Sequence, residues 1–228
     1  SRTFQDSLKV ELVAIEKGSE VFFSVGSSAK FEKYSGPFFI SQTCSLGAFA
    51  QRENIRSKIV TASFAKWRPV GALVLNTRYS PQYTAGGDQA LLDGVRGSAD
   101  FHLGGWQGYE QTDLDAVVDL GAVKEIKSVS LRCLQDNNSW IFFPTTASFE
   151  YSEDGRVYSQ PVEIANDVSP EDSRALVKEF TSGKNTEARF VRIRAKNLGV
   201  CPPWHKGAGS KAWLFADEIG IVALEESR

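Results

Sequence analysis

Apolar and polar side chains alternate along many short segments of this 228-residue chain, and this pattern constrains the fold more than any other feature. In FVRIRA, for example, Val191, Ile193 and Ala195 lie on one side of an extended chain. Arg192 and Arg194 lie on the other side, as in a strand with one buried and one solvated face. The chain also holds 15 Phe, 6 Tyr and 5 Trp, and aromatic residues favour strands. We therefore expect an all-β protein.

Residues 7–67 contain five such segments, separated by turns that hold Gly, Ser and charged residues. The segments are LKVELVAI, EVFFSVG, PFFIS, CSLGAFAQ and SKIVTASFAKW. Period-two runs at this spacing are typical of a small antiparallel sandwich. The sequence WRPVGALV then breaks the pattern with a Pro and a Gly, which indicates a domain boundary. We expect one domain over residues 1–68 and a second over 69–228.

The second domain begins with a long loop-rich segment and continues with several short strands. The expected strands lie in AVVDLG, EIKSVSLRCL, ASFEYSEDGRVY, ALVKEF, ARFVRIRAKN and WLFADEIGIVAL. The SEDG turn is a hairpin signal. The one expected helix is a turn or two within GDQALLDG. Short strands joined by long loops favour a jelly-roll-like sandwich.

Charge and hydropathy exclude two classes of partner. The 28 acidic and 26 basic residues nearly balance, and no run rich in Lys or Arg occurs, so nucleic acid is not an expected partner. No apolar run approaches the roughly 18 residues that a membrane helix needs.

The first residues do not form a signal peptide, and Met is absent even at position 1. We therefore expect this chain to be a fragment of a longer one.

The three cysteines carry little information. An odd number leaves at least one thiol free, and a Cys133–Cys201 disulfide stays open as an alternative. Cys201 and His205 have a spacing that suits zinc, but two ligands do not make a site, so zinc is not expected.

The chain shows no sign of catalysis. A glycosidase needs two carboxylates that face each other across a cleft. The acidic clusters SEDG and SPEDS are typical of turns, and LEES is typical of a solvated terminus. Nothing resembles a nucleophile elbow, a Walker loop or an HExxH helix. We expect no catalytic residue.

Three acidic residues stand in apolar surroundings. Asp217 and Glu218 lie between WLF and IGIV, and Asp93 follows two leucines. A buried carboxylate needs a partner, and one calcium ion would satisfy Asp93 and Glu218, with a hydroxyl from Ser98. Alternatively, Asp93 starts a turn and Glu218 faces solvent. The residues alone leave both alternatives open.

Three tryptophans stand in loops: Trp106 in GGWQGYEQTD, Trp140 in LQDNNSWIFFP and Trp204 in GVCPPWHKGAGS. Hydrogen-bonding side chains accompany them on the last two loops, namely Asp136, Asn137, Asn138, His205 and Lys206. A sugar has an apolar C–H face and a rim of hydroxyl groups, and an aromatic platform with polar neighbours matches both. Alternatively, each indole is buried at the rim of the core.

Residues 84–224 resemble the discoidin, or coagulation factor V/VIII type C, family. The similar segments are ALLDG, AVVDLG, SVSLRCLQD, FEYSEDGRVY, ARFVRIRAKN and FADEIGI. Bacterial members are often family 32 carbohydrate-binding modules. The resemblance implies a discoidin-type jelly roll with a structural Ca²⁺. The implied ligands are the side chains of Asp93, Ser98 and Glu218 and the carbonyls of Ala90, Val95 and Asp217.

The resemblance also implies a sugar site on three loops, which we name the first loop (99–110), the second loop (134–143) and the third loop (199–211). His102 matches a histidine that binds galactose-type sugars in relatives, and Trp204 stands where relatives place a stacking aromatic. We expect Trp106 to line or buttress this site. Leu134 replaces an arginine of galactose-binding members, so specificity for galactose does not carry over. The complete expected site is His102, Trp106, Asp136, Asn138, Trp140, Trp204 and His205.

Residues 7–67 resemble the small immunoglobulin-like domain that follows the catalytic barrel of bacterial chitobiases and β-hexosaminidases. The similar segments are GSEVFFSV, YSGPFFIS and SLGAFAQRENIRSKIVTASF, although VGSSAKF stands where an Asp-Gly is usual. The domain order resembles the C-terminal tail of a glycoside hydrolase family 20 enzyme. The two resemblances together imply a non-catalytic bacterial fragment, periplasmic, cell-surface or secreted, beside a catalytic hydrolase domain. Its expected ligands are glycans with terminal galactose or N-acetylhexosamine.

Two alternatives remain open at this stage. A discoidin domain that binds a protein or a membrane would use the apolar run SWIFFP to enter lipid, although no basic collar surrounds it. A structural spacer would bind nothing and would expose an apolar patch on residues 1–67.

Overall fold

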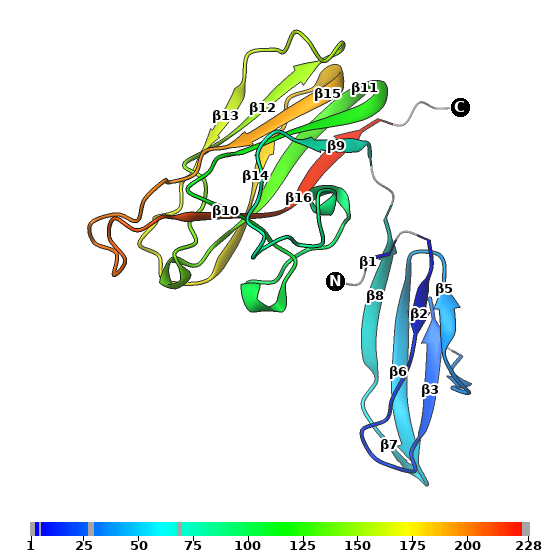
Figure 1. The fold of residues 1–228 in the computed structure, drawn as a ribbon. Coiled ribbons are helices and arrows are strands. Elements are labelled where there is room, and N and C mark those ends of the chain that lie inside the picture. Colours follow the sequence, from blue (N-terminus) through cyan, green and yellow to red (C-terminus); the bar gives the residue numbers. More distant parts are fainter. Residues whose placement is uncertain (1–2, 5, 27–29, 68–69, 225–228) are drawn as a thin grey trace. The chain divides into compact units, whose positions relative to one another are not determined.

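The computed structural model describes residues 3–4, 6–26, 30–67 and 70–224. These residues are almost entirely strands and loops, which confirms the expected all-β class (Figure 1). The chain divides into two compact units, residues 1–68 and 69–228, with the boundary where the sequence predicts it.

Unit 1, residues 1–68, is a small β-sandwich. Its strands are β1 Thr3–Phe4, β2 Leu8–Val10, β3 Glu20–Val25, β4 Glu32–Lys33, β5 Phe38–Ile40, β6 Cys44–Arg52, β7 Ile55–Arg56 and β8 Val60–Lys66. One sheet has the order β1-β8-β6-β3-β4 with β7 beside β6, and β2 pairs with β5 in a second sheet. Buried side chains from both sheets, among them Val10, Ile40 and Leu46, form one core. All pairings are antiparallel except β1 with β8, so the expected sandwich is confirmed.

Unit 2, residues 69–228, is a larger sandwich. Its strands are β9 Ala72–Leu75, β10 Gln107–Glu110, β11 Leu114–Gln135, β12 Thr146–Ser152, β13 Val162–Ala165, β14 Leu176–Ser182, β15 Thr186–Ala195 and β16 Trp213–Ala223. The long strand β11, green in Figure 1, belongs to both layers. Residues 114–119 pair with β15 and, over 116–119, with β9. Further along the strand, residues 126–134 pair with β16 and residues 129–135 pair with β14.

The bend that lets β11 change layers lies where its register with β15 shifts, between Asp119 and Lys124. Gly121 lies within this interval at φ +78°, a conformation that glycine adopts without the cost of a Cβ clash. The two layers enclose the core of unit 2. Strand β11 contributes Leu114, Val118 and Leu131 to this core, and none of the three has exposed surface.

The alternation in FVRIRA is confirmed. Val191 and Ile193 in β15 have no exposed surface, while Arg192 and Arg194 lie on the outer face. Both guanidinium groups pair with Asp115 of β11, at 2.6 and 3.4 Å. The solvated face of this layer is therefore held by ion pairs across neighbouring strands.

The described residues form three short 3-10 helices and no α-helix. The expected turn within GDQALLDG is the 3-10 helix η1, Ala90–Leu92, and two further single turns occur, η2 Phe101–Leu103 and η3 Asn137–Ser139. A hairpin is present at SEDG, since β12 pairs with β13 in antiparallel fashion, but the second strand is Val162–Ala165 and not the predicted RVY, residues 156–158, which form no strand. The connection is longer than a tight turn and begins at Ser152, whose hydroxyl accepts a hydrogen bond from the N–H of Gly155.

Candidate functional site

Strand β16 carries a bulge at the acidic pair. Arg132 of β11 stands opposite Glu218, and the next residue, Cys133, stands opposite Ala216. Asp217 is therefore the extra residue of a β-bulge, a feature that redirects side chains. The bulge explains how two consecutive carboxylates turn toward the same segment, residues 93–98, instead of pointing to opposite faces of the sheet.

Both carboxylates bind the backbone of that segment. Glu218 Oε2 accepts a hydrogen bond from the N–H of Gly94 at 3.0 Å, and Asp217 Oδ2 accepts one from the N–H of Gly97 at 2.7 Å. The guanidinium of Arg132 pairs with Asp217 and also donates to the carbonyl of Gly97. Residues 93–98 are thus held to β16 by charge-assisted bonds.

Asp93 and Glu218 are close enough to influence each other. Burial, together with the negative charge of Asp93, raises the pKa of Glu218 to about 8, and burial also raises the pKa of Asp93. Glu218 Oε1 is buried and has no hydrogen-bond partner. A buried carboxylate oxygen without a partner, beside a second carboxylate, has the chemistry of a ligand for a hard cation. The residues present therefore fit a calcium ion.

The other expected calcium ligands lie on the same segment or beside it. Val95 donates its N–H to Asp93 Oδ1 at 2.7 Å, and Ala90 is buried in η1, which packs against β16. The hydroxyl of Ser98 donates to the carbonyl of Asp100. The side chain of Asp217 is occupied by Arg132 and Gly97. The described residues hold no group of three or more His, Cys, Asp or Glu side chains suited to a metal, so a cation here would depend on carbonyl and hydroxyl oxygens as well.

Trp106 is a core residue, so of the two expected roles, lining or buttressing a ligand site, its burial is compatible only with buttressing. Its side chain is only 2% exposed and packs with Leu134, Ile141 and Phe215. Its Nε1 donates to the carbonyl of Ser98 at 2.9 Å. Because Ile141 belongs to the second loop, Trp106 fixes the first loop to the second.

The glycines around Trp106 have a packing role. A Cβ at Gly97 would stand 2.3 Å from Trp106 Nε1, so the absent side chain lets the indole approach the backbone. Gly104 and Gly105 both have φ +83°, in the left-handed region. The glycine-rich sequence thus allows the turn that buries the indole.

His205 is also buried, which corrects the expectation that it meets a ligand directly. Its ring is 7% exposed, and its Nδ1 accepts a hydrogen bond from the N–H of Gly207 at 3.0 Å. Nε2 therefore carries the proton and donates to the carbonyl of Asn137 at 2.6 Å. With both nitrogens bound to backbone, His205 joins the third loop to the second. It is not free to bind zinc together with Cys201.

Trp140 and Trp204 flank this imidazole. Their ring centroids lie 5.4 and 5.7 Å from that of His205, both edge to face. Trp140 is half-buried and has a φ of +61°. Its Nε1 lies against Gly207, where an added Cβ would stand 2.0 Å from that nitrogen. Trp204 is 44% exposed, which is unusual for so large an apolar side chain. The two indoles, one half-buried and one open, lie on neighbouring loops.

Of the three remaining expected residues, His102 is the most open. Its side chain is 75% exposed, and Nδ1 lies 2.9 Å from the carboxylate of Asp100. Asp136 accepts a hydrogen bond from the hydroxyl of Ser139, and exposed Asn138 donates to the carbonyl of Ser173. The structure thus joins the second and third loops directly and brings in the first through Trp106. Among the described residues, His102 forms hydrogen bonds and ring contacts only within the first loop.

A fourth loop, residues 166–175 between β13 and β14, was missed by the sequence analysis. Gln135 donates to the carbonyl of Ser169, and Asn137 donates to the carbonyl of Pro170. Together with the Asn138–Ser173 bond, these contacts place the fourth loop beside the second. Gln135 and Asn137 of LQDNNSW are the sequence signal, since buried amides need partners from elsewhere in the chain.

The apolar run SWIFFP is not displayed for a membrane. Ile141, Phe142 and Phe143 are 1%, 1% and 3% exposed and belong to the cores of unit 2. In the described part of the chain, no helix has the length and hydropathy needed to cross a bilayer.

The disulfide that the sequence left open does not form. All three cysteines are free. Cys133 lies in the main core of unit 2, and Cys201 lies in a separate small cluster with Phe142 and Ala212.

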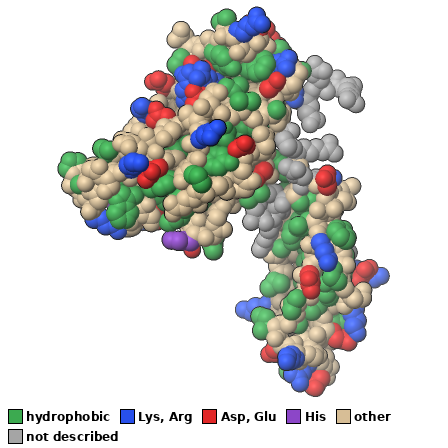
Figure 2. Space-filling view, viewed as in Figure 1, with side chains coloured by type: hydrophobic (Ala, Val, Ile, Leu, Met, Phe, Trp, Pro, Cys, Tyr) green, Lys and Arg blue, Asp and Glu red, His purple; other side chains and the backbone are tan. Residues whose placement is uncertain are grey.

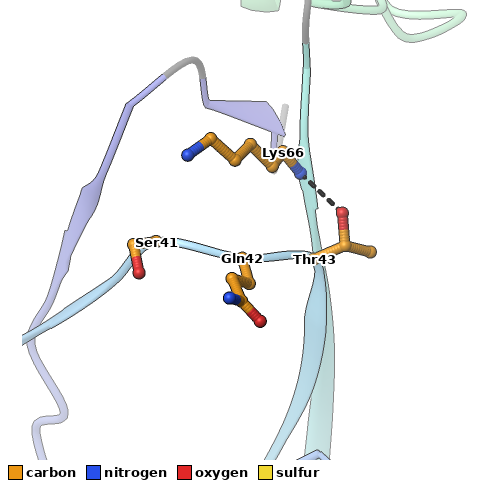
Figure 3. Close-up of a pocket in the computed structure, with 4 residues that line it drawn as sticks. All are labelled: Ser41, Gln42, Thr43 and Lys66. Carbon is orange, nitrogen blue, oxygen red and sulfur yellow. Dashed lines mark hydrogen bonds between the residues drawn. The ribbon is translucent and has the colours of Figure 1, made fainter.

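A hollow of about 560 Å³ in unit 1 is lined by Ser41, Gln42, Thr43 and Lys66. The side chain of Lys66 extends across the segment that carries Ser41 and Gln42, and its backbone N–H donates to the Thr43 hydroxyl (Figure 3). Its lining holds one cation, no aromatic ring and no carboxylate.

Charged side chains of both signs are interspersed on the face seen in Figure 2, as the balanced composition predicts.

Comparison with known proteins identifies a family for most of unit 2. Residues 76–215 match the sequence model of the F5/8 type C domain. No curated protein matches the chain. Similar solved structures include the Clostridium perfringens module CpGH89CBM32-5 in complex with GalNAc-β-1,3-galactose, at 19% identity and a TM-score of 0.43, covering 67% of this chain and 94% of that one.

Two further similar structures come from other bacteria. The C-terminal domain of a chitobiase from Bacteroides fragilis is 14% identical with a TM-score of 0.40, and the match covers 70% of this chain and 98% of that one. A fucose-binding module from Streptococcus pneumoniae is 11% identical with a TM-score of 0.40, and the match covers 69% of this chain and 96% of that one.

Proposed function

The chain belongs to the F5/8 type C domain family, and from this membership we propose that unit 2 is a non-catalytic carbohydrate-binding module with its ligand on the second and third loops. The observation that carries the proposal is the pair of indoles on these loops. Trp204 is open to solvent, Trp140 is half-buried, and both are fixed against His205. An exposed, immobilised indole offers a flat apolar surface to the C–H face of a sugar.

Polar groups beside the indoles supply hydrogen bonds to hydroxyl groups. Asn138, Lys206 and Asp136 lie on the same two loops, and His102 of the first loop is exposed. The proposed ligands are glycans with terminal galactose or N-acetylhexosamine. Leu134, where galactose-binding relatives have an arginine, is fully buried against Trp106, so a polar contact from that position is absent.

We further propose that unit 2 holds a structural Ca²⁺ between residues 93–98 and β16. Asp93 and Glu218 would supply carboxylate oxygens, Ser98 a hydroxyl, and Ala90, Val95 and Asp217 carbonyls. The support is the partnerless buried oxygen of Glu218 and the mutual influence of the two carboxylates. A bound cation would neutralise both charges and fix the segment whose far end, Ser98, anchors Trp106.

Unit 1 is proposed as the immunoglobulin-like spacer that joins the module to a catalytic hydrolase domain of the same bacterial protein. Large apolar side chains are exposed on unit 1, notably Val13, Ile15, Phe39 and Ile55 at 68% or more. Packing on the hydrolase domain would cover part of these apolar side chains. The proposed location is the periplasm, the cell surface or the outside of a bacterium, where such hydrolases meet glycans.

A glycan-array screen of the chain with calcium present, followed by calorimetric titration of each hit, tests the proposed function. A single module with one small sugar makes few contacts, so weak binding is expected, and display on the array compensates by multivalency. Binding to glycans with terminal galactose or N-acetylhexosamine is the expected result. A blank array with folded protein would contradict the module function and leave the spacer role for the whole chain.

A further inference from the structure

One cation on the binding loops lacks an anionic partner. The exposed ammonium of Lys206 lies 5.0 Å from the ring centroid of Trp140, and no described carboxylate lies within ion-pair distance of it. The other lysine and arginine side chains of the four loops are each paired, Arg174 with Asp172 at 2.6 Å and Lys211 with Glu110 at 3.2 Å. Lys206 is therefore the loop cation with a free charge.

The third loop places Lys206 against the Trp140 indole. His205 is buried and held at both ring nitrogens, and its two neighbours, Trp204 and Lys206, are exposed. The anchored imidazole thus holds the exposed indole of Trp204 before it in the chain and the exposed ammonium of Lys206 after it. The contact with the Trp140 ring restrains the lysine, because an ammonium is attracted to the negative face of an indole.

No described acid of the same loops forms an ion pair with Lys206. Asp100 and Asp172 are the partners of His102 and Arg174, and Asp136 accepts a hydrogen bond from Ser139. A cation kept near an aromatic platform and left without a counter-charge matches a ligand that brings its own negative charge.

We propose that the binding surface takes an acidic glycan, in which a carboxylate or sulfate group pairs with Lys206 while a sugar ring packs on Trp204. This inference rests on the proposed carbohydrate-binding function and specifies its ligand class. The charged group lies on the terminal sugar. Lys206 is then a specificity-determining residue of the module.

Calorimetric titration with matched neutral and acidic ligands tests the proposal. The probes are galactose against galacturonic acid and N-acetylgalactosamine against its 6-sulfate, which separates a carboxylate from a sulfate as the source of the charge. At least one acidic member should bind about tenfold more tightly than its neutral partner, which corresponds to about 1.4 kcal/mol. Added salt should reduce that advantage, because it screens an exposed ion pair.

Two variants assign the preference to Lys206. Lys206→Gln should bring the acidic and neutral affinities together, and Lys206→Arg should keep the preference. The matched control is Lys211→Gln, in the same loop with the same loss of charge, because Lys211 is already paired with Glu110. This control should keep the preference.

Three outcomes would overturn the proposal. Equal affinity of wild type for neutral and acidic ligands would refute the acidic class and leave carbohydrate binding intact. A preference that survives Lys206→Gln in a variant with the thermal stability of wild type would assign the charge recognition elsewhere. Failure of folded wild type to bind any of the four sugars, or any glycan of an array, would refute the proposed function itself.

Discussion

His205 Nε2 donates to the carbonyl of Asn137 at 2.6 Å, and this bond joins two loops that are 68 residues apart in sequence. The loop that carries Trp204 is thereby attached to the loop that carries Trp140. Sugar binding on these loops depends on that attachment, because a stacking indole contributes only when it is held in place.

We predict that His205→Ala lowers both stability and sugar affinity. The variant leaves the carbonyl of Asn137 and the N–H of Gly207 without their partner and opens a cavity between Trp140 and Phe142. The expected loss is about 1–3 kcal/mol in the free energy of unfolding, with a loss of affinity. Urea unfolding and calorimetry measure the two effects. The control His102→Ala, an exposed side chain, should lower affinity alone, and equal stability losses in the two variants would contradict the anchoring role of His205.

Trp106→Ala should destabilise unit 2 strongly. The indole is buried among Leu134, Ile141 and Phe215, so its removal costs about 3–5 kcal/mol. Chemical unfolding followed by circular dichroism measures the loss. Trp204→Ala, which removes the same side chain from an exposed position, should cost less than about 1 kcal/mol. Similar losses for both tryptophans would show that Trp106 is not a core residue.

Calcium should raise the melting temperature of wild type, and Glu218→Gln should abolish that rise. Without calcium, the same variant should be about as stable as wild type at neutral pH, because burial and Asp93 raise the pKa of Glu218 to about 8, so this carboxyl is already mostly protonated there and an amide is its neutral counterpart. Differential scanning calorimetry with calcium and with a chelator measures both effects. Glu179→Gln, at a half-exposed carboxylate paired with Arg96, is the control and should keep the calcium response. An unchanged response in Glu218→Gln would place the cation elsewhere.

The calcium response should grow with pH. The pKa of Glu218 is raised from its ordinary 4.5 to about 8 in the folded chain, so the folded state holds this proton more tightly than the unfolded state does. Without calcium, stability therefore falls as pH rises between these two values. Calcium needs the ionised carboxylate, so its stabilising effect should be larger above pH 8 than at pH 6. A calcium effect that is equal at both pH values would contradict the assignment of Glu218 as a ligand.

Acid should weaken the ion pair between Asp119 and Arg189. The Arg189 guanidinium, together with the N–H of Gly121, lowers the pKa of Asp119 to about 2. The stabilisation is present above the ordinary pKa of an aspartate and is lost as pH falls toward 2. Because the pair is exposed and screened by solvent, its expected contribution to stability is small. Asp119→Asn should remove this part of the acid sensitivity in urea unfolding at several pH values, and an unchanged pH profile would contradict it.

The sequence predicts the strands of this chain well because the period-two pattern is local. Val191, Ile193 and Arg192 show the two faces of β15 without any knowledge of the rest of the chain. The boundary near residue 68 is equally local, since a Pro and a Gly interrupt the alternation there.

The burial of Trp106 and His205 was not predictable in the same way, because it depends on distant residues. Trp106 is covered by Leu134 and Phe215, and its glycine-rich surroundings are typical of an exposed loop until Gly97 is seen to accommodate the indole. His205 is held by a carbonyl of another loop. The bulge at Asp217 depends on register with β11, which no local pattern encodes.

The most direct test of the account is calorimetric titration of the chain and of its Trp204→Ala variant with the strongest glycan from the array. The account predicts measurable binding by wild type and at least about a tenfold loss in the variant, with thermal stability unchanged. Phe39→Ala, which removes another exposed aromatic ring in unit 1, is the matched control and should bind as wild type does. Wild-type affinity in a folded Trp204→Ala protein would contradict the assignment of the glycan to these loops.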